Sequence, residues 1–503
     1  MFSRILSAAV CGMEGLPVYV EADVSEGLPG FSMVGDLSAK VREAQDRVTT
    51  AFRNSGIRLM PKRVTINLSP AGVHKDGTGF DLPIALAVLS AYGILPLQAA
   101  EGILAVGELG LNGAVKGVRG VLPMVLAAKQ LGCRVCILPE ANRREGELIP
   151  EMRIVGVESL QEVLAYLQEG KLPGRENIPP LYIEETESSD FRFLNGQALL
   201  RRAAEVAAAG RHNFLMSGPP GAGKSLLAKC IPGILPPLSM EESLEVSAIY
   251  SVAGLLSKEQ PLVTKRPFRS PHHTISPQAL AGGGRIPRPG EISLAHRGVL
   301  FLDELPEFRR ETLEVLRQPM EDKKVHITRI HGSCIFPAES MIVAAMNPCK
   351  CGYFPDMERC TCSDREIRQY LKRVSMPLLD RMDISVEVSR VKYEELASDG
   401  ANECSAKIRA RVEAAGQRQA ERYQGSTFRF NAELTAEGIK KYCSVSGEAQ
   451  RLLQEAYSRL DLSARGYHRI LKVARTIADL DGCGQIGADH ICEAVGYRMF
   501  EKR

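Results

Sequence analysis

The sequence contains no tryptophan, and aromatic residues make up only 6% of its 503 positions. A binding surface built mainly on stacked aromatic side chains is therefore not expected. An excess of one charge is also missing, because 63 basic residues face 60 acidic ones and leave a formal net charge of +3. So small a net charge does not by itself indicate a nucleic-acid partner, and any basic surface must be local.

The chain also lacks a long, uninterrupted apolar run. The stretch from Leu82 to Ala100 carries no charge, but Gly93 and Pro96 interrupt it, which favours a buried helix followed by a turn over a membrane span. The segment Met1–Gly12 has only a short apolar part that continues into strand-like sequence, and we interpret it as part of the fold rather than a signal peptide. We therefore expect a cytoplasmic protein without a membrane partner.

Cysteine occurs 13 times, an odd number that argues against a disulfide framework and for reduced thiols. Four of them form two C-x-C pairs separated by eight residues: Cys349, Cys351, Cys360 and Cys362. Four thiolates around a turn-rich spacer suit a tetrahedral Zn²⁺ site, although the inner spacing is tighter than the common C-x₂-C. Free surface thiols or two adjacent disulfides are the alternatives. Because exposed thiols are a liability in a reducing compartment, we predict zinc.

The length of the chain suggests about three domains. Short apolar strands alternate with helix-like runs over the first 170 residues, whereas helical periodicity dominates the C-terminal part. A polar, proline-rich stretch with few apolar anchors lies between the first domain and the next. We expect an N-terminal α+β domain over 1–170, a linker over 171–190, a central α/β domain over 191–394 and a helical domain over 395–503.

A complete phosphate-binding loop, G-x-x-x-x-G-K-[ST], occupies residues 218–225. Its glycines let backbone N–H groups wrap a phosphate, Lys224 reaches the β and γ phosphates, and the Ser225 hydroxyl can ligate Mg²⁺. A short apolar strand precedes the loop and a helix follows it, a context that a chance glycine-rich turn does not need. The predicted contacts of a nucleoside triphosphate are Gly218, Pro219, Pro220, Gly221, Ala222, Gly223, Lys224 and Ser225.

Two further apolar strands end in polar side chains. The first ends in Asp303, placed to hold Mg²⁺ through water, and Glu304, placed to polarise the attacking water as a general base. Two acids at the end of a buried strand would be costly without such a role, and ordinary solvated acids are the alternative. The second strand ends in Asn347, which could orient the water or sense the γ-phosphate; alone, an asparagine before proline is also a turn residue.

Together with the segment Leu378–Asp383, these elements resemble the AAA+ ATPases. The motifs Arg266–His273, Gly290–Gly298 and Ala344–Cys349 are similar to the magnesium-chelatase-like branch, and the full-length pattern resembles the YifB/ComM family within it. The resemblance implies a multidomain α/β protein with a central P-loop ATPase domain, a C-terminal helical lid, and ATP and Mg²⁺ as cofactors.

The resemblance also implies roles that spacing alone does not give. Arg381 matches the arginine finger, which would reach the γ-phosphate bound by a neighbouring subunit and so implies a ring, here expected to be a homohexamer. Arg465 matches the sensor-2 arginine, with Arg469 as the rival. The alternatives are a surface or capping arginine at position 381 and a solvated basic helix end at position 465.

The N-terminal segments His74–Phe80 and Gly107–Gly113 resemble the proteolytic domain of Lon, which implies a Lon-like, ribosomal-S5-like α+β fold. Gly79 stands where that family has its nucleophilic serine, and Leu122 stands where it has its catalytic lysine. A serine–lysine dyad needs both groups, so we predict no peptidase activity. The fold is expected to serve another purpose, such as DNA contact or ring assembly.

Two local basic segments flank the strand that ends in Asp303. Within the AAA+ resemblance they match the helix-2 insert and the pre-sensor hairpin, which grip the substrate in the pore of motor members. Basic side chains there suit a phosphate backbone, although an ordinary solvated charged face is the alternative for any single residue. The candidate DNA contacts are Arg266, Arg269, Lys323, Lys324, Arg329 and His331.

Three functions are compatible with these patterns. The first is an ATP-driven ring that acts on single-stranded or branched DNA, as a translocase or branch-migration helicase in recombination or natural transformation. The second is a chelatase-type remodelling ATPase that acts on a protein or metal-insertion partner. The third, a Lon-like ATP-dependent protease, is disfavoured by the missing dyad. The basic hairpins and the cysteine cluster favour the first over the second.

Overall fold

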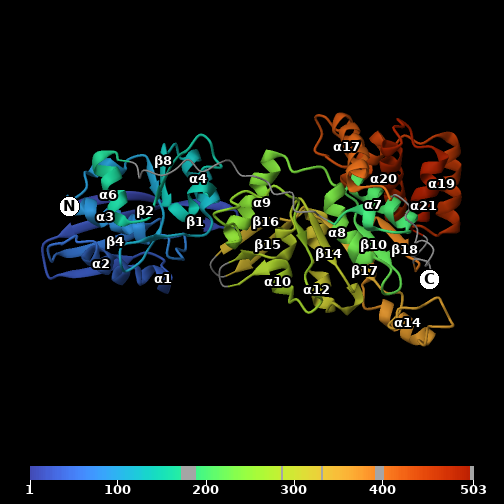
Figure 1. Ribbon diagram of the computed structural model, residues 1–503, viewed down its shortest axis with the longest axis horizontal. Coiled ribbons are helices and arrows are strands. Elements are labelled where there is room, and N and C mark those ends of the chain that lie inside the picture. Colours follow the sequence, from blue (N-terminus) through green and yellow to red (C-terminus); the bar gives the residue numbers. More distant parts are fainter. Residues whose placement is uncertain (172–188, 285–286, 330–331, 391–401, 499–503) are drawn as a thin grey trace.

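The computed structural model describes residues 1–171, 189–284, 287–329, 332–390 and 402–498. Three parts follow one another along the long axis: a mixed sheet with helices, a parallel sheet with helices, and a helical C-terminal region (Figure 1). The expected multidomain α/β architecture with a helical C-terminal region is therefore confirmed. Most of the expected linker and the boundary expected at 394/395 fall at positions 172–188 and 391–401, outside the described residues.

The N-terminal sheet has the strand order β3-β4-β2-β1-β5-β8-β9 and is covered on both faces. Side chains of β1 alternate between two cores, because Ile5 and Ala9 pack in the cluster that contains α3, whereas Ala8 packs in the cluster that contains α4. The main elements are β1 (Phe2–Cys11), β2 (Glu14–Ser25), β3 (Gly30–Val34), α2 (Ala44–Asn54), β4 (Arg63–Ser69), α3 (Asp81–Ala91), β5 (Ile103–Ala105), α4 (Val121–Gln130), β8 (Val135–Pro139), β9 (Arg153–Val157) and α6 (Leu160–Glu169).

Helix α3 explains the uncharged stretch of the sequence. Every residue of this helix is buried, so its apolar character runs all round rather than along one face. Gly93 has a φ of 73° and lies in the turn that follows, as expected from the sequence. In the described ranges, no helix combines the length and the apolar character that crossing a membrane requires.

The central sheet has five parallel strands in the order β11-β14-β17-β10-β18. Short, fully buried strands are typical of a parallel sheet with helices on both faces. The carboxyl ends of β10, β14 and β17 therefore lie at one edge of the sheet, and their amino ends lie at the other. The elements are α7 (Ala198–Gly210), β10 (Phe214–Ser217), α8 (Lys224–Ile234), α9 (Met240–Ala253), β11 (Phe268–Arg269), β14 (Val299–Leu302), α13 (Arg317–Asp322), β17 (Met341–Met346) and β18 (Ile384–Glu387).

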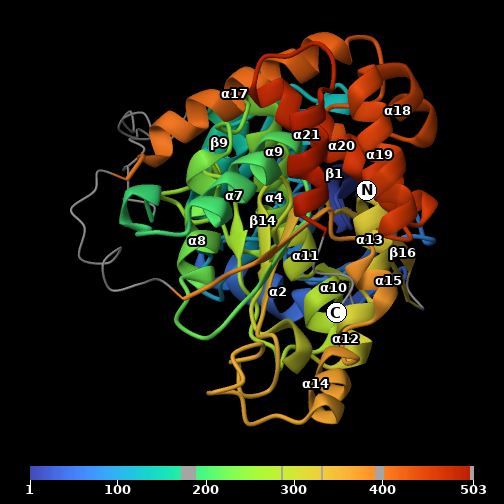
Figure 2. The same ribbon diagram turned by 90° about the vertical axis from the view of Figure 1, so that its right-hand side faces the viewer.

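Two appendages leave this sheet. The first is the antiparallel hairpin β15 (Lys324–Arg329) and β16 (Gly332–Pro337), at the position expected for the pre-sensor hairpin. The second is the cysteine-rich segment with α14 (Asp364–Leu371). Figures 1 and 2 show α14 on the opposite side of the molecule from α17.

The C-terminal region consists of α17 (Ser405–Arg422), α18 (Ala436–Tyr442), α19 (Gly447–Arg459), α20 (Ala464–Leu480) and α21 (Ala488–Gly496), which gather at one end of the molecule (Figures 1 and 2). A helical region was expected here from the periodicity of the sequence. The apolar side chains of these helices join the core of the central sheet, since Val412 and Ile477 belong to the same buried cluster as Ala204 of α7 and Phe214 of β10. The helical region and the sheet thus share one continuous core.

The N-terminal domain contacts the central domain through buried polar groups. Glu145, only 6% exposed, accepts hydrogen bonds from the Ser251 hydroxyl of α9 and, at 3.0 Å, from Leu122 N–H. Burial raises the pKa of Glu145 above its usual range, although the hydrogen bonds from Ser251 and Asn142 oppose this shift. A second contact joins Cys11 of β1 and Cys334 of β16, whose Sγ atoms lie 2.9 Å apart.

Candidate active site

The phosphate loop lies between β10 and α8, as the sequence predicts. Gly221 and Gly223 adopt φ angles of 76° and 83°, in the left-handed region that glycine enters without strain. Lys224 is the first residue of α8 and is only 8% exposed. The backbone N–H groups at this helix start and the helix dipole both favour an anion at the loop.

The Lys224 ammonium is held over the loop. Its Nζ donates to the carbonyl oxygens of Gly218 and Pro219 and, at 3.1 Å, to Asn347 Oδ1. Burial lowers the pKa of Lys224 to about 8, and the nearby Asp303 carboxylate opposes this shift. The amine is therefore still mostly protonated at neutral pH, the form that attracts phosphates.

Two oxygen ligands for Mg²⁺ meet beside the loop. Ser225 Oγ donates to Asp303 Oδ2 at 2.6 Å, which joins the first helical turn of α8 to the end of β14. The other carboxylate oxygen of Asp303 accepts from Glu304 N–H at 2.9 Å. Hydroxyl and carboxylate oxygens are the ligands that Mg²⁺ prefers, so Ser225 and Asp303 fit this ion.

Glu304 points from the end of β14 toward the segment after β11. It adopts a φ of 52°, its side chain is 55% exposed, and its Oε2 lies 3.2 Å from His273 Nδ1. The His273 ring packs edge-on to the buried Phe308, with ring centroids 6.4 Å apart. Sequence reasoning included His273 in a motif but gave it no role, because only the fold brings this residue to the end of β14.

Asn347 follows β17 and lies at the same sheet edge. Its bond to Lys224 connects the end of β17 to the phosphate loop. Gly352, a few residues further on, has a φ of 86°, and a Cβ there would lie 2.7 Å from Pro220 Cδ. The loop that carries the first two cysteines therefore packs directly against the phosphate loop.

The four cysteines predicted to hold a metal come together. Their Sγ atoms all lie within 4.8 Å of one another, including 3.3 Å between Cys349 and Cys351 and 3.5 Å between Cys351 and Cys360. Such separations exceed a disulfide bond of about 2 Å and suit four thiolates around one ion with Zn–S bonds of about 2.3 Å. The donor set formed with Cys362 thus fits Zn²⁺.

Arg381 lies at the opposite edge of the central sheet. Its backbone oxygen accepts from Asn213 Nδ2 at 3.1 Å, and Asn213 immediately precedes β10. Its guanidinium donates to Glu321 Oε1 at 2.6 Å and to Pro377 O at 2.7 Å. Within one chain, Arg381 and the phosphate loop are therefore separated by the length of a strand.

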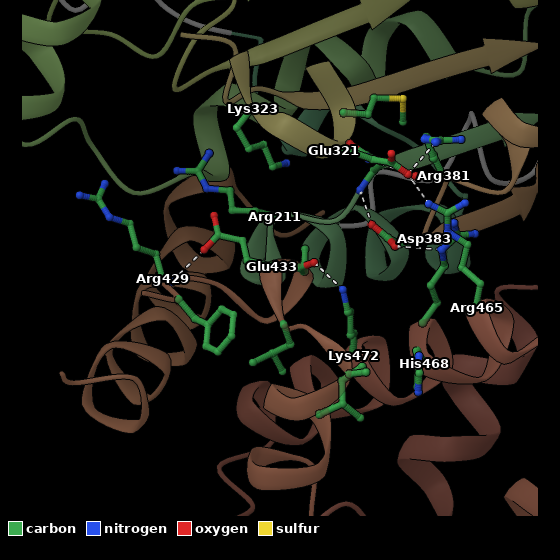
Figure 3. A pocket seen from close by; sticks show the side chains of 18 of the residues that line it. Arg211, Glu321, Lys323, Arg381, Asp383, Arg429, Glu433, Arg465, His468 and Lys472 are labelled. Atoms are coloured by element: carbon green, nitrogen blue, oxygen red, sulfur yellow. Dashed lines mark hydrogen bonds and ion pairs between the residues drawn. The ribbon is translucent and has the colours of Figure 1, made fainter. Parts of the chain in front are cut away.

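Arg465 joins Arg381 at that edge. It lies in the first turn of α20, where the helix dipole does not favour a cation, and it binds the same Glu321 oxygen (Figure 3). The rival residue Arg469 is buried against Asp383, with Nε 3.7 Å from Oδ1, and burial lowers its pKa to about 10 while Asp383 opposes the shift. Because Arg465 is 48% exposed, it is the more accessible of the two.

The six candidate DNA contacts have different surroundings. The Arg266 side chain is 5% exposed and donates to Arg297 O at 2.7 Å and to Glu242 at 3.0 Å. Arg269 forms a bidentate pair with Glu291 at 2.6 and 2.7 Å. A DNA contact by either arginine would require these pairs to open.

The remaining four candidates belong to the hairpin region. Lys323 directly follows α13 and is partly buried, whereas Lys324 begins β15 and is exposed. Arg329 ends β15, and His331 lies outside the described residues. Exposed Lys324 is thus the most accessible of the described candidates whose side chains are placed.

The two positions matched to the Lon dyad are surrounded by apolar atoms. A Cβ at Gly79 would lie 3.3 Å from a methyl group of Val106, and Leu122 is fully buried in a hydrophobic cluster. Neither position offers a nucleophile or a base.

Comparisons with known proteins match nearly the whole length of the chain. The model of magnesium chelatase, subunit ChlI, matches residues 190–396, and models of the ChlI subunit and of its C-terminal part match 20–142 and 402–498. The protein YifB of Salmonella typhimurium is 42% identical over 98% of this chain and 96% of its own length. The competence protein ComM of Haemophilus influenzae is 41% identical over 98% and 97%.

The chain belongs to the YifB/ComM family of magnesium-chelatase-like AAA+ proteins. Membership implies ATPase activity with ATP and Mg²⁺, in a family whose members are usually oligomeric. Lon protease 2 of Bacillus subtilis is 30% identical over 145 residues, which are 27% of this chain and 26% of that protein. This partial similarity to Lon lies in the N-terminal region.

Proposed function

We propose that this YifB/ComM-family chain is one subunit of a homohexameric ring that hydrolyses ATP between subunits and moves DNA. The observation that carries the ring is the position of Arg381. The phosphate loop follows the carboxyl end of β10, whereas Arg381 binds Asn213 at the amino end of that strand. The four residues of β10 span about 13 Å, so an arginine finger at one edge serves a nucleotide bound at the other edge of the next subunit.

Each residue around the phosphate loop has a separate role in ATP hydrolysis. Lys224 binds the β and γ phosphates, and Ser225 and Asp303 would hold Mg²⁺, which would supply positive charge beside the phosphates. Glu304 accepts a proton from the water that attacks the γ-phosphorus, and Asn347 orients that water. As the bond to the ADP leaving group breaks, Arg381 and Arg465 of the neighbouring subunit stabilise the charge on the transferred phosphate.

DNA is the proposed substrate because basic residues lie on the hairpin β15–β16. Lys324 is exposed at its base, and the hairpin contacts the N-terminal domain through Cys334 and Cys11. The similar protein from Haemophilus influenzae is named a competence protein, which supports a role in natural transformation or recombination. In this account the inactive Lon-like domain contacts the motor rather than cutting peptides.

A chelatase-type remodelling ATPase is the second candidate. Two observations favour it. The matching family models describe a magnesium-chelatase subunit. In addition, Arg266 and Arg269 form ion pairs with Glu242 and Glu291, which makes both arginines less available to DNA. A Lon-like protease is the weakest candidate, since Gly79 and Leu122 occupy the dyad positions.

The cysteine cluster is proposed to hold one structural Zn²⁺ per chain. The ion would fix the loop from Cys349 to Cys362, and Gly352 of this loop packs against Pro220. When bound, zinc supplies rigidity rather than chemistry, because four thiolates leave no open coordination position.

ATP turnover measured with and without single-stranded or forked DNA, at moderate salt, separates the first two candidates. A motor on DNA is expected to show several-fold stimulation and a DNA affinity that falls steeply with salt. Lys324→Gln should weaken this binding, while Lys440→Gln, an exposed lysine in the last turn of α18, serves as the control. If ATP turnover does not change when DNA is added, and no salt-sensitive DNA binding is detected, the DNA motor is excluded and the remodelling ATPase is left.

A further inference from the structure

A cavity of about 620 Å³ lies between the central sheet and the helical region (Figure 3). Arg381 and Arg465 line one end of it, where both bind Glu321. Arg469 and Lys472 of α20 also line it, and the charge of Asp383 acts on both. Three further cations line the cavity: Arg211 after α7, Lys323 after α13, and Arg429 between α17 and α18. We call Arg211, Lys323 and Arg429 the basic triad.

Carboxylates lie near the basic triad: the charges of Glu242 and Glu339 act on Arg211, and Glu433 accepts a hydrogen bond from the backbone N–H of Arg429 at 2.8 Å. Among the described residues, however, none of the basic triad's three side chains forms a hydrogen bond or an ion pair with an acidic group. Arg211 stacks over the Phe430 ring, 5.1 Å from its centroid, and its buried Nε lacks a hydrogen-bond partner. A buried donor without a partner is costly, which indicates that an anion completes this site.

The local backbone conformation does not explain why cationic residues occupy these positions. Arg211 and Lys323 have φ angles of 58° and 56°, in the left-handed region that glycine or asparagine occupies at lower cost. Burial, followed by the charge of Arg266, lowers the pKa of Arg211 to about 9, so this side chain is still a cation at neutral pH. Arg211 and Lys323 thus follow the ends of two helices, and each has a strained backbone conformation beside the same cavity.

Three apolar side chains also line the cavity. Phe428, Leu434 and Ile439 line it from the helical region, facing the same space as the basic triad. Cations for a phosphate and apolar side chains for a ring are the two features that a nucleotide pocket combines, and the volume lies in the range of small-ligand sites.

We propose that this cavity binds a nucleoside phosphate, with the phosphate on the basic triad and the base against Phe428, Leu434 and Ile439. The nucleotide is either free or part of a nucleic-acid strand, since both present the same phosphate and ring. The site is distinct from the phosphate loop, because none of the residues 218–225 lines this cavity. The inference does not rest on DNA as the substrate, but Arg381 and Arg465, which the proposed function assigns to the neighbouring subunit's nucleotide, lie at the other end of the same cavity.

Full-length Lys224→Ala protein tests the site, because this variant weakens the phosphate loop and leaves the basic triad intact. ADP and a short oligodeoxythymidine are the two probes, each titrated at physiological salt. Binding of ADP identifies a free nucleotide as the source, and binding of the oligonucleotide alone identifies a strand. In either case, adding Arg211→Gln or Arg429→Gln should weaken binding by about tenfold or more, because each removes one charged contact to phosphate.

Arg451→Gln provides the matched control, since Arg451 is exposed on α19 and does not line the cavity. It should bind both probes like the parent Lys224→Ala protein. Arg429 is exposed, so its substitution tests the site even if Arg211→Gln does not fold. The proposal is overturned if neither probe binds the Lys224→Ala protein, or if the Arg429 variant binds them as tightly as the control.

Discussion

Arg381 and Arg465 bind the same carboxylate oxygen, Oε1 of Glu321, although they come from the central domain and from helix α20. The side chain of Glu321 is 47% exposed, and that of Arg381 is only 12% exposed. One surface carboxylate therefore fixes the mutual position of the two arginines assigned to the neighbouring subunit's nucleotide. It also connects the helical region to the edge of the central sheet.

This shared carboxylate makes Glu321 a positioning residue. Glu321→Gln should lower kcat about tenfold while the KM for ATP stays nearly constant, because the phosphate loop that binds ATP is at the other sheet edge. Asp322→Asn is the control, since the side chain of the neighbouring Asp322 bonds Gln318 at 3.1 Å instead. A rise in KM without a change in kcat would contradict this role.

Glu304→Gln is expected to abolish turnover and preserve nucleotide binding. Loss of a general base typically costs a factor of about 10²–10⁴ in rate, whereas Lys224, Ser225 and Asp303 still hold the nucleotide. Single-turnover hydrolysis and ATP binding are measured on the same preparation. Wild-type turnover in this variant would refute the assignment of Glu304 as the base.

Removal of zinc should lower ATP turnover, because Gly352 of the cysteine-bearing loop contacts Pro220 of the phosphate loop. The purified protein is expected to contain about one Zn²⁺ per chain, and Cys351→Ser or Cys360→Ser to contain much less, with reduced ATP turnover. Cys483→Ser, at an exposed thiol outside the cluster, should keep the metal. Less than about half an equivalent in protein purified without chelator would argue against a zinc site.

The contact between the N-terminal and central domains should depend on pH through Glu145. Its pKa is raised in the folded protein, so the folded state holds a proton that the unfolded chain releases. This group therefore adds stability as pH falls through the folded pKa toward the usual value of 4.5. Relative to Glu145→Gln, the wild type should gain unfolding free energy as the pH falls from 7 toward 4.5 in urea titrations. A difference that is flat, or that has the opposite sign, would show that Glu145 is not buried in this way.

Local patterns made much of this molecule predictable. The phosphate loop, the buried helix α3 and the helical character of the C-terminal region follow from motifs and hydrophobic periodicity within short windows. Asp303 and Asn347 could be predicted as neighbours because each directly follows an apolar strand, and parallel strands bring their carboxyl ends to one edge.

Contacts between distant positions were not predictable from such windows. Glu321 is 60 positions from Arg381 and 144 from Arg465, and no periodicity connects them. Likewise, the sequence predicted DNA contacts at Arg266 and Arg269. In the fold, each of these arginines is paired with an acidic residue more than 20 positions away. The basic triad was missed because its three members belong to three separate elements.

The central claim is that two subunits build each ATPase site, and mixing two inactive variants tests it most directly. Lys224→Ala lacks the phosphate-loop lysine, and Arg381→Ala lacks the finger, so each protein alone should have almost no turnover. In an equimolar mixture, about a quarter of the interfaces of randomly mixed rings pair an intact Lys224 with a neighbour's intact Arg381. The account predicts that mixing restores about a quarter of wild-type turnover. A mixture as inactive as its components, in rings shown to contain both variants, would contradict it.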